Sequence, residues 1–118
     1  MFCFFTASTY PMDISTVFKN NQAWIEQKLQ GEPGYFDRLG SGQNPDLLYI
    51  GCSDSRVSAE ELMGAEPGEI FVHRNIANMV ISIDLNAMSV INYAVKYLKV
   101  SKIVVCGHYG CGGVQAAM

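Results

Sequence analysis

The chain has 118 residues, of which 49% are hydrophobic and 16% are charged, and its formal net charge is −3. This length allows a single domain, and the composition excludes a disordered, collagen-like or coiled-coil protein. The weakly acidic balance and the lack of a basic cluster argue against a nucleic acid or a membrane as partner.

The cysteines indicate a reducing compartment. The sequence contains Cys3, Cys52, Cys106 and Cys111, a number that would suggest two disulfides in a secreted chain. The N-terminus lacks the basic segment of a secretory signal, because the first basic residue is Lys19. We therefore expect a cytoplasmic protein, with targeting to an organelle left open, in which clustered Cys and His residues serve metal binding or catalysis.

Helical and extended patterns alternate along the chain. After an irregular leader over residues 1–12, apolar residues at a 3.6-residue spacing predict a helix over 13–30. Short apolar runs predict strands at 47–50, 70–73 and 102–106, and helices are expected at 58–63, at 84–98 and from Val114 onward. This alternation indicates an α/β fold with three layers around a central, mostly parallel sheet.

Two polar loops carry the residues of chemical interest. One covers residues 51–56, directly after the first strand, and the other covers residues 107–113, directly after the third. Both follow the carboxyl ends of strands, where open α/β sheets build their sites. With a local strand order of 2-1-3, strands one and three are neighbours and the two loops face each other.

This arrangement would bring Cys52, His108 and Cys111 together. Two thiolates and an imidazole suit zinc, and three protein ligands leave a fourth position, as in catalytic zinc sites. The alternative for each cysteine is a small buried apolar side chain. Phosphate binding by the glycine-rich loop and a redox pair are weaker alternatives, because the sequence lacks the Gly-Lys-Ser/Thr and Cys-x-x-Cys patterns.

Asp54 and Arg56 lie two residues apart in the first loop. One interpretation is a surface ion pair of little energetic value. The other is a carboxylate that Arg56 holds bidentately beside the metal, where it orients a metal-bound hydroxide. If Arg56 released it, Asp54 would become a fourth metal ligand and close the site.

These residues belong to four blocks that resemble the β-class carbonic anhydrases. The blocks are Gly51–Val57, Gly68–Asn78, Tyr93–Val100 and Gly107–Val114, and they occur in the family's order. The resemblance runs from about residue 13 to the end of the chain. It implies one zinc ion on Cys52, His108 and Cys111, and the Asp54–Arg56 dyad as catalytic residues.

The implied function is the zinc-dependent, reversible hydration of carbon dioxide to bicarbonate and a proton by a zinc-bound hydroxide. In the family, the substrate pocket is shaped partly by the dimer mate, and the matching residues here are Gln43, Phe71, Ile76 and Tyr93. The resemblance also implies a homodimer or a dimer of dimers, with the N-terminal helix packing on the partner. Two alternatives stay open: hydrolysis of carbonyl sulfide or carbon disulfide on the same scaffold, and an inactive zinc-binding fragment.

The resemblance also changes the expectation about domain organisation. Family chains are substantially longer and continue past the Gly-Gly-Val segment with more sheet. We therefore expect residues 13–118 to form a β-carbonic-anhydrase-like α/β domain that is truncated at its C-terminus.

Overall fold

The computed structural model describes residues 12–118 and divides into two compact units, with the boundary in the chain between Gly40 and Ser41. Each unit is described by itself. The expected leader over residues 1–12 lies, but for its last residue, outside the described part of the chain. Within residues 12–118, no helix has both the length and the apolar character needed to cross a membrane.

Over residues 12–40, the first unit consists of two helices, α1 (Ile14–Gly31) and α2 (Tyr35–Gly40). Asp13 is the N-cap of α1, close to the predicted start, whereas the short α2 was not predicted. The two helices meet through aromatic rings, because Trp24 packs edge-on against Tyr35 and Phe36 with ring centroids 6.2 and 5.6 Å apart. No residue of α1 is buried, so most of its apolar side chains face solvent.

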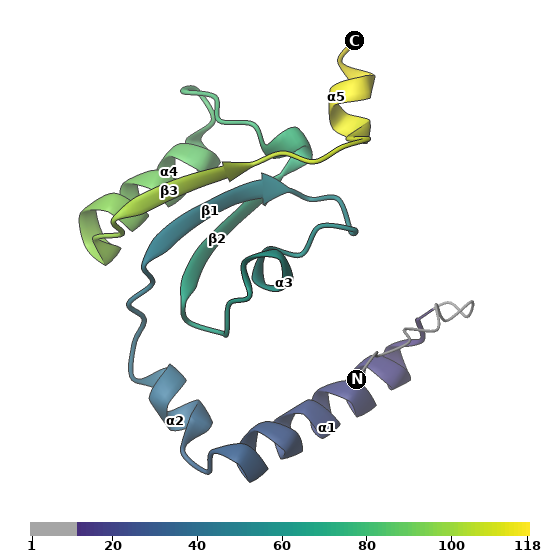
Figure 1. The fold of residues 1–118 in the computed structure, drawn as a ribbon, viewed down its shortest axis with the longest axis vertical. Coiled ribbons are helices and arrows are strands. Elements are labelled where there is room, and N and C mark those ends of the chain that lie inside the picture. The colour runs from purple at the N-terminus through teal and green to yellow at the C-terminus, as the bar shows by residue number, and fades with distance from the viewer. Residues whose placement is uncertain (1–11) are drawn as a thin grey trace. The chain divides into compact units, whose positions relative to one another are not determined.

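The second unit contains the sheet, whose three strands run β2-β1-β3 with both pairings parallel (Figure 1). The strands are β1 (Leu47–Cys52), β2 (Ile70–Asn75) and β3 (Lys102–Cys106). The predicted strand order is therefore confirmed. The apolar run of β1 is almost entirely buried because this strand is central, while β3 is an edge strand with three exposed residues.

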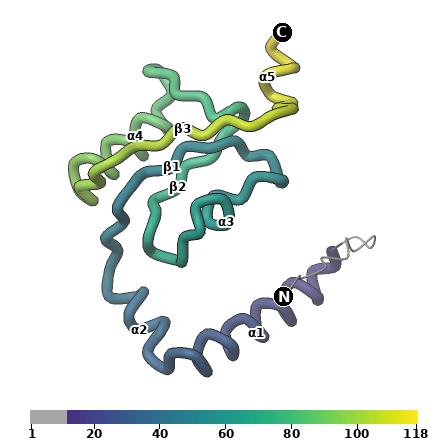
Figure 2. The backbone as a smooth tube through the Cα atoms, in the orientation of Figure 1, coloured from purple at the N-terminus to yellow at the C-terminus, as the bar shows by residue number. Residues whose placement is uncertain are grey.

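Helices lie on both faces of this sheet. The connection from β1 to β2 contains α3 (Ala59–Met63), and the connection from β2 to β3 contains α4 (Leu85–Tyr93) and the π-helical η2 (Ala94–Leu98). The first crossover moves across the sheet from β1 to β2, and the second moves in the opposite direction, from β2 past β1 to β3. Because crossovers between parallel strands are right-handed, the helices of these two lie on opposite faces of the sheet. The tube in Figure 2 shows this arrangement, with α3 in front of the sheet and α4 behind it.

The core lies between the sheet and the long crossover. Leu48 and Ile50 of β1 and Ala94 of η2 form the buried cluster. The sequence pattern predicts one continuous helix over 84–98. In the structure, α-helical hydrogen bonding ends at Tyr93 and π-helical hydrogen bonding begins at Ala94. The N–H of Lys99 donates to the Ala94 carbonyl, which closes a π-helical turn that ends with Lys99 in the left-handed region at φ 57°.

Candidate metal centre

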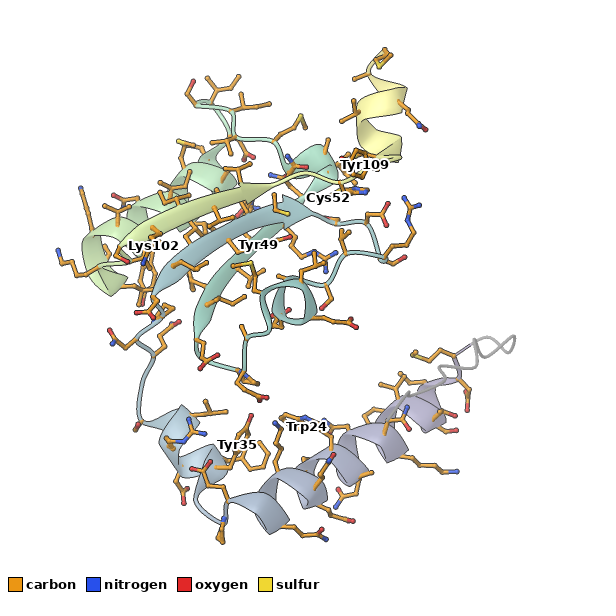
Figure 3. The ribbon with its side chains drawn as sticks, viewed as in Figure 1. Trp24, Tyr35, Tyr49, Cys52, Lys102 and Tyr109 are labelled. Carbon is orange, nitrogen blue, oxygen red and sulfur yellow. The ribbon has the colours of Figure 1, made fainter. Side chains whose placement is uncertain are left out.

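The carboxyl ends of β1 and β3 bring three potential metal ligands together. The Sγ atoms of Cys52 and Cys111 and one ring nitrogen of His108 all lie within 4.8 Å of one another. The two sulfurs are 3.9 Å apart, and both cysteines are free and buried. Figure 3 shows Cys52 and Tyr109 at the same end of the sheet, with Lys102 at the opposite end. The predicted juxtaposition of the two loops is thus present in the structure.

The imidazole of His108 has one nitrogen free to bind a metal ion. Its Nδ1 lies 3.1 Å from the carbonyl oxygen of Tyr109, to which it donates in the tautomer that leaves Nε2 unprotonated. Nε2 is buried and has no hydrogen-bond partner among the described residues; the nearest carboxylate oxygen, Oδ2 of Asp54, is 3.8 Å away. A buried nitrogen lone pair beside two thiols fits a metal with N and S preferences, and zinc is such a metal.

The surroundings of Cys52 favour its thiolate form. The backbone N–H of Asp54 is the largest influence, followed by the ring of His108, and together with the N–H of Ala77 they lower the pKa of the Cys52 thiol to about 7. A thiolate is the form that binds metal. Ala77 can present its N–H in this way because it lies in a tight turn, η1 (Ile76–Asn78), where its φ is 61° and that of Asn78 is 46°.

Two further contacts hold this η1 turn in place. Asn75 brackets the turn, because its side-chain Nδ2 donates to the carbonyl of Met79 at 2.7 Å and its Oδ1 accepts from the Met79 N–H at 2.7 Å. Gly113 packs on the turn so closely that an added Cβ would lie 2.5 Å from Ile76 Cγ2 and 3.2 Å from the Ala77 nitrogen. Only glycine allows this approach of the helix α5 (Gly112–Ala116) to the turn.

Asp54 and Arg56 form the bidentate pair that the sequence predicts. Arg56 donates from Nε to Oδ1 at 2.9 Å and from Nη2 to Oδ2 at 2.7 Å, and its backbone N–H also donates to Oδ1 at 3.0 Å. These bonds hold the pKa of the Asp54 carboxyl well below its usual range. Arg56 Nη2 also donates to the carbonyl of Gly110 at 3.1 Å, so one guanidinium joins the carboxylate to the loop between the other two ligands.

The four residues expected in the substrate pocket lie in different places. Ile76 is in the η1 turn beside Gly113, and Gln43 is exposed in the segment before β1. Phe71 pairs with Leu48 in the register, four residues before Cys52, and therefore lies about 13 Å along the sheet from the ligand end at ~3.3 Å per residue. Its ring is 5.8 Å from that of Tyr93. The structure thus brings one of the four to the ligand cluster of the same chain.

A surface cavity of about 500 Å³ adjoins the cluster at His108. It is mainly apolar, and its lining consists of Val57, Leu62, Cys106, Gly107, His108 and Tyr109. None of the four expected pocket residues lines it.

One residue with direct contacts to the site was not assigned a role there by the sequence. Arg74, near the end of β2, donates from Nε to the carbonyl of Cys52 at 2.8 Å and from Nη2 to the carbonyl of Asp54 at 2.6 Å. The signal that would have found it is the register, because parallel pairing places Arg74 opposite Gly51, one residue before the first ligand.

Comparisons with known proteins agree with this geometry. The model of the carbonic anhydrase family matches residues 47–118. A carbonic anhydrase of Emericella nidulans is 63% identical over 102 residues, and one of Candida albicans is 47% identical over 103 residues. Each alignment covers 86% of this chain, but only 45% and 36% of the respective relative. The chain therefore spans less than half the length of these relatives.

Among solved structures, a tetrameric β-carbonic anhydrase of Sordaria macrospora superposes with a TM-score of 0.85 at 48% sequence identity. The match covers 87% of this chain and 52% of that chain. The likeness thus extends over both the sheet and the ligand loops.

Proposed function

This chain belongs to the β-class carbonic anhydrase family, and we propose that its activity is the reversible hydration of carbon dioxide to bicarbonate and a proton. The observation that supports this proposal is the cluster of Cys52, His108 and Cys111 next to a carboxylate that Arg56 holds in place. The two relatives compared above are carbonic anhydrases, although the chain spans less than half of their length.

The three ligand side chains would hold one zinc ion. Bound zinc lowers the pKa of a coordinated water towards about 7 and so supplies a nucleophile at neutral pH. With two thiolates and a neutral imidazole as its protein ligands, the ion would keep one position open for chemistry. The residues of this chain then have to orient the nucleophile, exclude competing ligands and accept hydrogen bonds.

We assign the orienting role to Asp54. Its carboxylate is ionised and lies 3.8 Å from the unpaired His108 Nε2, so it accepts hydrogen bonds from donors that enter the site. Arg56 engages both oxygens, and this keeps the carboxylate from turning towards the ligand cluster. Release of Asp54 from Arg56 would make it a fourth ligand and give the closed state.

We propose that the substrate pocket is completed by a second copy of the chain. Ile76 lies at the ligand cluster of its own chain, whereas the Phe71 and Tyr93 rings lie towards the other end of the strands. An aromatic pair so distant from its own cluster can serve the cluster of a partner. Gln43, exposed before β1, would supply the hydrogen bond to a substrate oxygen.

A homodimer, or a dimer of dimers, would also cover α1. Ile14 and Phe18 of this helix are 65% and 68% exposed, and their i, i+4 spacing places both on one face of the helix, which a partner would cover. Sedimentation velocity at micromolar concentration tests the assembly: Phe18→Asp should shift the boundary to the monomer, and the exposed neighbour Asn20→Asp should not. A wild-type chain that sediments as a monomer would contradict the proposed dimer.

Stopped-flow measurement of carbon dioxide hydration tests the activity. We expect a rate above buffer that requires zinc, that is lost with Cys111→Ser, and that survives the exposed substitution Asn20→Asp. A folded chain that binds one zinc ion per chain and gives no rate would instead support the alternative of an inactive zinc-binding protein. Hydrolysis of carbonyl sulfide or carbon disulfide is not favoured, because both curated relatives compared above are carbonic anhydrases.

We propose the cytoplasm as the location of the protein. Cys52 and Cys111 bind metal only as thiolates, and both are free in the structure, as a reducing compartment would keep them. Cell fractionation tests this: recovery of the protein in an organelle would contradict it.

A further inference from the structure

Arg74 connects β2 to the loop after β1 at two positions that matter for the site. Its Nε and Nη2 donate to the carbonyl oxygens of Cys52 and Asp54, at 2.8 and 2.6 Å. Cys52 supplies a sulfur of the ligand cluster, and Asp54 supplies the carboxylate that Arg56 holds. One guanidinium therefore bonds to the backbone of both groups.

The backbone here needs such a restraint because the sheet ladder ends at this point. Beyond Cys52, the bond from the Ser53 N–H to the carbonyl of Asn75, at 2.8 Å, is the last backbone–backbone bond between this loop and β2 among the described residues. The carbonyl of Asp54 accepts from the Val57 N–H at 3.2 Å, but this bond lies within the loop and does not tie it to the sheet. A guanidinium is planar, permanently charged and rigid, so its two donors set both the spacing and the orientation of the two peptide groups.

We propose that Arg74 is a positioning residue of the metal centre: it fixes the Cys52–Asp54 segment so that the Cys52 sulfur faces His108 and Cys111 while the Asp54 carboxylate stays with Arg56. The proposal rests on the proposed function, since positioning matters only if the cluster holds a metal. It goes beyond that function, because Arg74 contacts neither the ligand atoms nor the carboxylate itself. It acts through two backbone carbonyls.

The test compares Arg74→Gln, Arg74→Lys and the matched control Arg38→Gln, which removes an exposed guanidinium from the first unit. Zinc affinity is measured by competition with a chromophoric chelator, at equal folded fraction as judged by circular dichroism. We expect Arg74→Gln to weaken zinc binding by about 10–100-fold, the usual effect of losing a partner behind the ligands. Arg74→Lys should recover only part of this, because one ammonium cannot present two fixed donors.

Amide hydrogen exchange of the metal-free chains gives a second readout that needs no metal and no activity. Residues 53–56 should exchange faster in Arg74→Gln than in wild type and remain unchanged in Arg38→Gln. Zinc affinity within twofold of wild type for Arg74→Gln, or complete recovery of both readouts by Arg74→Lys, would overturn the proposal. If Arg74→Gln does not fold, Arg74→Lys carries the same comparison. A wild-type chain that binds no zinc would refute the proposed function, and the exchange data would still decide whether Arg74 holds the loop.

Discussion

Replacement of Gly51 by alanine should destabilise the second unit, although it adds a single methyl group. An added Cβ would lie 2.3 Å from Cε1 and 2.9 Å from Cζ and Oη of Tyr49, two residues earlier on the same face of β1. Ordinary contact begins at 3.4 Å, so ring and strand must separate by about 1.1 Å. Tyr49 is only 1% exposed, which leaves its ring no open space to move into.

The magnitude follows from two opposing effects. Overpacking of a well-packed core costs about 1–3 kcal/mol, and the confined ring places Gly51→Ala towards the upper end. Alanine gains back roughly 0.5–1 kcal/mol because it loses less backbone entropy than glycine in a strand. We expect a net loss of about 2 kcal/mol in the free energy of unfolding. In a unit of this size, that lowers the melting temperature by about 8–16 °C.

Urea and thermal unfolding, followed by circular dichroism, measure this effect. The control is Gly112→Ala in helix α5 of the same unit, where an added Cβ meets nothing within 4 Å, and it should keep or raise stability, by up to about 1 kcal/mol. Adding Tyr49→Leu to Gly51→Ala removes the ring from the contact, and the two changes should couple by about 1–2 kcal/mol. If Gly51→Ala is as stable as Gly112→Ala, or shows no coupling with Tyr49→Leu, the overpacking argument is refuted.

Three further outcomes are expected. Asp54→Asn should leave the fold and the bound zinc intact but reduce the hydration rate by about 10–100-fold, measured by stopped flow. The neutral amide has a single acceptor oxygen, so it cannot keep both bonds from Arg56. An unchanged rate would contradict the orienting role. Burial, with the Cys106 thiol second, raises the pKa of Tyr49 to about 12. Its protonated form is thus favoured by folding, so this stability is present below pH ~10 and is lost as the pH rises through about 12. Absorbance titration at 295 nm should show the late component in wild type and not in Tyr49→Phe. Lys99→Gly should raise the free energy of unfolding by about 1 kcal/mol in urea titrations, because glycine adopts the left-handed φ of 57° without the penalty of a side chain; lower stability would count against strain at this position.

The sheet and the ligand cluster were predictable because they depend on local patterns. Apolar runs mark the three strands, and the two polar segments lie at the carboxyl ends of β1 and β3. Once parallel order 2-1-3 is assumed, the carboxyl ends of β1 and β3 must meet, which brings Cys52 to His108 and Cys111. The two loops are far apart in sequence, but the strand order alone makes them neighbours.

Other features escaped prediction because they depend on geometry between elements. Helix α5 begins at Gly112 and not at Val114, because Cys111 serves as its N-cap and accepts from the Gln115 N–H. The left-handed backbone at Ala77 has no signal in an alanine side chain. The contacts of Arg74 with two carbonyls require the strand register, which a single sequence does not display.

The metal centre links two strands that differ strongly in how far they are buried. β1 is central and almost fully buried, while β3 is at the edge of the sheet within residues 12–118, where Ile103 and Val105 are 45% and 54% exposed. One ligand, Cys52, is the last residue of β1, and the other two follow β3. Edge strands open locally far more often than central ones. The lifetime of a bound ion should therefore be set by local opening of β3 and not by the bond between the ion and Cys52. A bound ion should in turn stabilise β3 by linking it to the buried strand β1.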